Sequence, residues 1–145
     1  IPLKSLLCKS QLIRLNVSIF FLHAILVSLF LIIPIILQSH VDLSKHWLVY
    51  LVIMLSSVFC MLPGLYLSEK GGWQKQALKM SIILVGISCI LLTYVNGSLA
   101  LTMLVLILFF AAFNFLEASL PSLASKLAPV GNKGASLGVY STFQF

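Results

Sequence analysis

Long apolar runs separated by short polar links dominate the chain. Four such runs cover residues 15–38, 47–67, 77–95 and 99–127, and a shorter one covers 132–145. A helix rises 1.5 Å per residue, so about 20 apolar residues cross the hydrocarbon core of a bilayer. The pattern therefore predicts an all-α membrane protein with four transmembrane helices and the start of a fifth.

The links between the runs are too short to hold a soluble domain. They read "SHVDLSKH", "SEKGGWQKQ", "NGS" and "APVGN". Short links place consecutive helices beside each other in antiparallel order. We therefore expect one continuous helical bundle.

The composition agrees with a membrane location. The chain is 61% hydrophobic and 8% charged, and its mean hydropathy is +1.14. Soluble domains are near half apolar and a quarter charged. The net charge of +6 is interpreted as the loop-charge bias that orients membrane helices, and no nucleic-acid partner is expected.

The basic residues alternate between the two sides of the predicted bundle. Three basic residues precede or begin the first run: Lys4, Lys9 and Arg14. The basic residues in or beside the four links then number one (Lys45), three (Lys70, Lys75 and Lys79), none, and two (Lys126 and Lys133). Cytoplasmic loops carry the excess of Lys and Arg. The counts predict a cytoplasmic N-terminal end, second link and last link.

Glu117 is one of only three acidic residues, and it lies within a predicted transmembrane helix. A charge at the bilayer centre costs about 2.5–3.5 kcal/mol on insertion scales. Helical periodicity places Asn114 and Pro121 on the same face as Glu117. Two interpretations remain open: a protonatable group that lines a cavity, and a carboxyl that is hydrogen-bonded to a neighbouring helix as a packing device.

The first apolar run carries a similar polar face with Asn16 and His23. His23 could relay protons, since imidazole titrates near neutral pH. It could equally form a hydrogen bond between helices. In the second run, Ser57 lies on a face of small residues, which favours close helix packing.

The sequence contains no pattern typical of an enzyme. There is no pair of carboxylates, no Cys/His cluster with metal-ligand spacing and no phosphate-binding loop. We therefore expect no catalytic site, metal or cofactor.

The segment "FFAAFNFLEASLPSLASKLAPVGNKGASLGVYSTFQF", residues 109–145, resembles a region of the major facilitator superfamily. It is similar to the tenth helix, the following cytoplasmic loop and the start of the eleventh helix of a bacterial drug-efflux-like subgroup. The resemblance implies that residues 1–145 form part of the C-terminal half of a twelve-helix, two-bundle transporter. It also implies a multi-pass protein of the bacterial inner membrane.

A second resemblance lies in the link "SEKGGWQK". Glu69, Lys70 and Gly72 match the acidic–basic–any–Gly core of the family's cytoplasmic loop motif. The leading glycine of that motif is displaced and its later arginine is missing, which weakens the expectation of a gating salt bridge.

The resemblance implies proton-coupled secondary efflux of small amphipathic compounds by alternating access. Its partners would be the lipid bilayer, the missing N-terminal half, the substrate and protons. Aromatic rings such as Phe113 and Tyr140 would suit an apolar substrate. The residues predicted to line the proton and substrate cavity are Glu117, Asn114, His23, Asn16, Phe110 and Gln144. In this cavity Asn114 is expected to be the hydrogen-bond partner of Glu117.

Two other interpretations belong to different classes. The chain could be a small membrane scaffold or assembly subunit that transports nothing. It could also be a membrane enzyme, which ranks last because its polar residues are spread through the helices rather than gathered at one interface.

Overall fold

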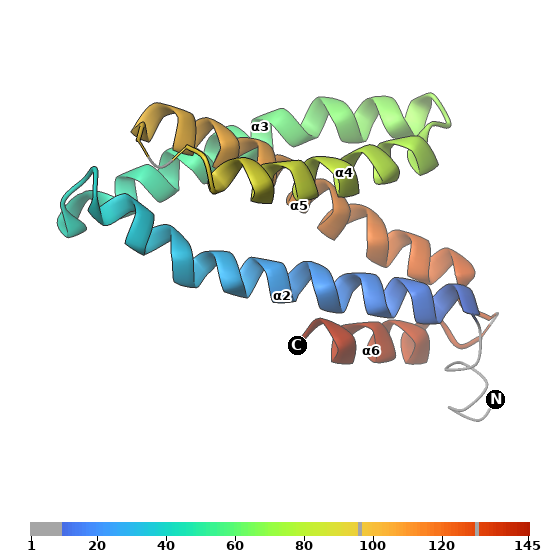
Figure 1. Ribbon diagram of the computed structural model, residues 1–145. Helices are drawn as coiled ribbons and strands as arrows, with labels where there is room; N and C mark the ends of the chain where they lie inside the picture. The colour runs from blue at the N-terminus through green and yellow to red at the C-terminus, as the bar shows by residue number, and fades with distance from the viewer. Residues whose placement is uncertain (1–9, 96, 130) are drawn as a thin grey trace. The chain divides into compact units, whose positions relative to one another are not determined.

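The computed structural model of the chain describes residues 10–95, 97–129 and 131–145 (Figure 1). Within these ranges the only regular elements are helices, which confirms the predicted fold class: α2 (Ser10–Gln38), the short 3-10 helix η1 (Leu43–Lys45), α3 (His46–Lys70), α4 (Gln74–Leu92), α5 (Leu99–Leu127) and α6 (Lys133–Gln144). Lys4 and Lys9, used in the charge count, lie outside the described residues.

Four of the described segments are long and apolar enough to span a bilayer: Ser10–Gln38, Leu43–Lys70, Gln74–Leu92 and Leu99–Leu127. The fifth helix, α6, has 12 residues, which correspond to about 18 Å of helix.

Several helices begin or end away from the predicted residues. α2 begins at Ser10 rather than 15, α3 runs from His46 to Lys70 rather than from 47 to 67, and α6 covers Lys133–Gln144 rather than 132–145. The apolar run indicates which residues lie in the hydrocarbon core of the bilayer. Backbone hydrogen bonds can continue the helix beyond those residues. Only α5 begins and ends where the sequence predicts.

The fourth boundary correction concerns α4, which runs from Gln74 to Leu92 instead of 77–95. Its end is tightened by short-range bonds, because the backbone N–H of Thr93 donates to Ile90 O at 3.1 Å. The Thr93 hydroxyl donates to the same carbonyl at 2.7 Å. The helix therefore stops while the sequence is still apolar.

The chain divides into two compact units. The first contains residues 1–30 and 117–145, and the second contains residues 31–116. In its described part, the first unit combines the start of α2, the end of α5 and all of α6. The second contains the end of α2, the helices α3 and α4, and most of α5, with α3 and α4 side by side (Figure 1).

The helices differ in how much of their surface the chain itself covers. In the most apolar stretch of α5, 50% of the residues are buried within the chain, compared with 17% in the corresponding stretches of α3 and α4. Large apolar side chains on α3 and α4 are exposed, such as Phe59 at 70% and Ile90 at 62%. Apolar outer surfaces of this kind suit contact with lipid or with further helices.

The turn between α3 and α4 depends on one glycine. Gly71 closes α3, with its N–H donating to Leu67 O at 2.9 Å. Gly72 then adopts a φ of +67°, a left-handed conformation that side chains with a Cβ resist. The geometry explains why a glycine occupies this position of the loop motif.

We predict that Gly72→Ala lowers the free energy of unfolding by about 1 kcal/mol, because alanine is strained at positive φ. A Cβ at this position would meet no atom within 4 Å, so the cost comes from the backbone alone. Detergent-based unfolding of the full-length gene product measures it. Gly64→Ala in α3 is the matched control, since its Cβ also meets nothing within 4 Å. Equal stability of the two variants would contradict the prediction.

Candidate functional site

A polar cluster in the first unit joins three helices. It consists of His23 from α2, Glu117 from α5 and Gln144 from α6. The Gln144 Nε2 group donates to Glu117 Oε1 at 2.7 Å and lies 3.2 Å from His23 Nε2. His23 Nε2 lies 3.7 Å from Glu117 Oε2. Gln144 is 27 positions from Glu117 and 121 positions from His23 in the sequence. Three of the predicted cavity residues thus lie together.

The hydrogen bonds of the cluster assign a donor or acceptor role to each nitrogen of the His23 ring. His23 Nδ1 lies 3.3 Å from Ile19 O, a carbonyl that can only accept, so this nitrogen carries the proton. In the neutral ring Nε2 is then an acceptor, and it can receive one N–H of Gln144. The Gln144 amide has a second N–H for Glu117, so one amide group serves both titratable side chains.

The cluster is only partly shielded from solvent. The side chain of Glu117 is 35% exposed and that of His23 is 14% exposed. The Oε2 atom of Glu117 is nevertheless buried and accepts no hydrogen bond within the described part of the chain. A protonated His23 would place an N–H on the side of this oxygen, since the two atoms are already 3.7 Å apart.

Sequence reasoning did not assign Tyr140 a polar role. The Tyr140 side chain is 2% exposed, and its hydroxyl is buried without a hydrogen bond in the described part of the chain. Tyr140 precedes Gln144 by one helical turn, so both face the same side of α6. That four-residue spacing was the signal that could have identified Tyr140.

Asn114 and Ser57 form a separate polar contact in the second unit. Asn114 Nδ2 donates to Ser57 Oγ at 3.2 Å, and Ser57 Oγ donates to Met54 O at 2.8 Å. Ser57 is fully buried. The predicted hydrogen bond from Asn114 to Glu117 is replaced, because Gln144 supplies the donor to Glu117 and Asn114 connects α5 to α3.

The two remaining cavity candidates are buried. Asn16 is 4% exposed and lies in the first unit, two turns before His23 on α2. Phe110 is 2% exposed and belongs to the second unit, where its ring meets Phe109 edge-to-face at 5.2 Å. Phe110 thus contributes to helix packing in this structure.

The loop motif lies at the end of α3. Glu69 is exposed, and the Lys70 ammonium donates to the Tyr66 hydroxyl and lies 4.5 Å from the centre of its ring. Lys70 therefore has a partner within its own helix. Gly72 forms the turn that follows.

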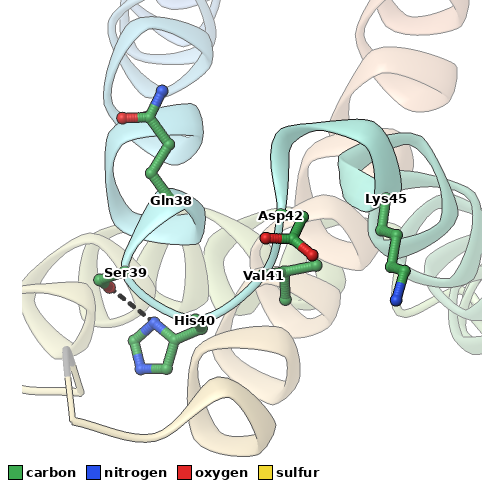
Figure 2. A pocket seen from close by; sticks show the side chains of 6 residues that line it. All are labelled: Gln38, Ser39, His40, Val41, Asp42 and Lys45. Carbon is green, nitrogen blue, oxygen red and sulfur yellow. Dashed lines mark hydrogen bonds between the residues drawn. The ribbon is translucent and has the colours of Figure 1, made fainter.

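A polar pocket of about 380 Å³ occupies the connection between α2 and α3 (Figure 2). Ser39 Oγ and His40 Nδ1 lie 2.7 Å apart at its edge, and Asp42 and Lys45 come from the other side of the loop. Within the described residues, no three His, Cys, Asp or Glu side chains are close enough to bind a metal ion together. The sequence analysis treated this segment only as a link.

The helices and the cluster define a polytopic α-helical membrane protein with a carboxyl group held between its helices. The chain matches the model of the Major Facilitator Superfamily over residues 1–145, and it belongs to that family. This confirms the family resemblance of the sequence. Membership in this family also agrees with the expectation that the chain is not an enzyme.

Three relatives of the chain are longer than the chain itself. It is 36% identical over 140 residues to the inner membrane transport protein YajR of Escherichia coli, covering 96% of the chain and 31% of YajR. Two uncharacterized transporters of Buchnera aphidicola strains are each 30% identical, with 91% and 97% of the chain covered. The chain spans 34% and 36% of these two proteins, about a third of each relative's length.

We predict that Ser57 and Asn114 stabilise the packing of α3 against α5 together. Ser57→Ala and Asn114→Ala should each destabilise the full-length gene product. The double variant should show a coupling energy of about 0.6 kcal/mol, the average for hydrogen bonds between membrane helices. A double-mutant cycle of unfolding free energies measures this coupling. Fully additive effects would mean that the two side chains act independently.

Proposed function

We propose that this chain is part of the C-terminal helix bundle of a proton-coupled secondary transporter, which exports small amphipathic compounds by alternating access. The observation that carries the proposal is the placement of Glu117 between the Gln144 amide and the His23 imidazole. A carboxyl so placed between membrane helices is typical of a proton or ion pathway.

The chemistry of the cluster suits exchange of a proton for a cation. With His23 neutral and Glu117 ionised, the pair carries one negative charge. A proton on either side chain removes that charge, and an amphipathic cation bound beside Glu117 would compensate it. Because both compete for the same charge, binding of one favours release of the other, as coupled antiport requires.

The remaining predicted residues have different places in this mechanism. Asn16 and His23 share a face of α2, so an amide lies two turns from the titratable pair. Asn114 and Phe110 would act from the second unit, where they shape the packing of α5. The lipid-exposed faces of α3 and α4 would hold the bundle in the inner membrane, with the Lys-rich links on the cytoplasmic side.

Alternating access requires a second bundle, which would come from the rest of a longer chain. The intact mass of the native gene product in membranes tests this requirement. We expect a mass roughly three times the 16.0 kDa of this chain, as the lengths of its relatives imply. A mass near 16.0 kDa would instead favour the alternative of a small, non-transporting scaffold subunit.

We predict that Glu117→Gln abolishes coupling to protons. In liposomes that contain the full-length protein and carry an imposed pH gradient, transport of the amphipathic cation ethidium should fall by about tenfold or more, because an amide has no exchangeable carboxyl proton. Glu69→Gln is the control, since Glu69 is an exposed acidic residue at the end of α3. Unchanged gradient-driven transport in Glu117→Gln would refute the role of this carboxyl, and absence of ethidium transport by the unmodified protein would refute the substrate class.

A further inference from the structure

One face of α6 carries polar side chains at every fourth position: Ser136, Tyr140 and Gln144. Ser136 is 4% exposed and Tyr140 is 2% exposed, and Gln144 is half-buried. The neighbouring Ser141 lies on the exposed side of the helix. The three polar side chains therefore form a stripe that points into the first unit, toward α2 and the end of α5.

Two atoms of this stripe lack a hydrogen-bond partner. Within the described residues, the Ser136 hydroxyl and the Tyr140 hydroxyl are buried and form no hydrogen bond, and the same is true of Glu117 Oε2. Buried polar groups are normally satisfied by protein or by ordered water, because an unpaired one is costly. The Ser119 hydroxyl is a fourth such atom among the described residues of the first unit. Four such atoms in one small unit indicate that something else satisfies them.

Water suits the role of that partner. A step of four residues keeps successive side chains of the stripe on one face of the helix. A water molecule bridges polar groups that are too far apart for a direct hydrogen bond. The two hydroxyls and the carboxyl oxygen supply the two or more polar partners that a buried water needs.

The Gln144 end of the stripe contacts the Glu117 carboxyl group. Gln144 donates to Glu117 Oε1 at 2.7 Å, and Tyr140 precedes Gln144 by one turn on the same face of α6. The other end approaches Lys133, where α6 begins. The charge bias of the links predicts that this end is cytoplasmic.

We propose that Ser136 and Tyr140, with water molecules between them, form a proton path from the Lys133 end of α6 to Glu117 Oε2. This inference rests on the proposed function, in which Glu117 exchanges a proton. Each hydroxyl or water on the path receives a proton on its oxygen and gives up its own, so that it ends unchanged. The net step transfers one proton from a hydronium ion at the helix end, which becomes water, to the Glu117 carboxylate, which becomes a carboxylic acid.

Hydrogen–deuterium exchange at Glu117 tests the path without the need for a substrate. The full-length protein in lipid is transferred from H₂O to D₂O, and the stretching band of the protonated carboxyl group is followed by infrared spectroscopy. The loss of this band in Glu117→Gln identifies it. We expect Tyr140→Phe and Ser136→Ala each to slow the exchange by about tenfold, which corresponds to one blocked step in the path.

Ser141→Ala is the matched control, because it removes a hydroxyl from the exposed side of the same helix. Its exchange rate should equal that of the unmodified protein. A Glu117 band that exchanges at the same rate in Tyr140→Phe and Ser136→Ala would overturn the path and leave both hydroxyls as packing groups. If no Glu117 band appears at any pH at which the protein stays folded, the carboxyl takes up no proton. The proposed function itself then fails, and the path fails with it.

Discussion

The hydrogen bond of 2.7 Å from Gln144 Nε2 to Glu117 Oε1 is the contact on which the first unit depends. It joins the end of α5 to the end of α6, and the same amide nitrogen reaches His23 on α2. A carboxyl group within an apolar helix is costly unless donors surround it. The three helices must therefore keep the rotation and depth that hold these side chains together.

The polar side chains of the two units serve different purposes. In the second unit, Asn114 and Ser57 form a neutral hydrogen bond between α5 and α3, and neither residue can change its charge near neutral pH. In the first unit, Glu117 and His23 are both titratable and share one amide donor. The second unit is therefore suited to stable packing, whereas the first can respond to protons.

The first unit contains buried polar atoms that form no hydrogen bond within the described residues, and membership in the Major Facilitator Superfamily bears on how these atoms are interpreted. Membrane helices rarely leave polar atoms unsatisfied in the hydrocarbon region, except where water or a partner reaches them. Glu117 Oε2, the Tyr140 hydroxyl and the Ser136 hydroxyl are such atoms within the described residues. The proposed transport function gives a physical reason to retain them, because a path for protons or ions must offer polar partners inside the membrane.

The sequence alone determined the class of fold, the approximate positions of the helices and the anomalous position of Glu117, because hydropathy and charge are local properties of the chain. It also identified the family from residues 109–145, and it placed Ser57 on a packing face. Only the tertiary structure decided that Gln144 rather than Asn114 donates to Glu117, that His23 completes the cluster and that Tyr140 is buried in the first unit. These pairings depend on how each helix is rotated and how deeply it lies against its neighbours, and packing between helices sets both quantities.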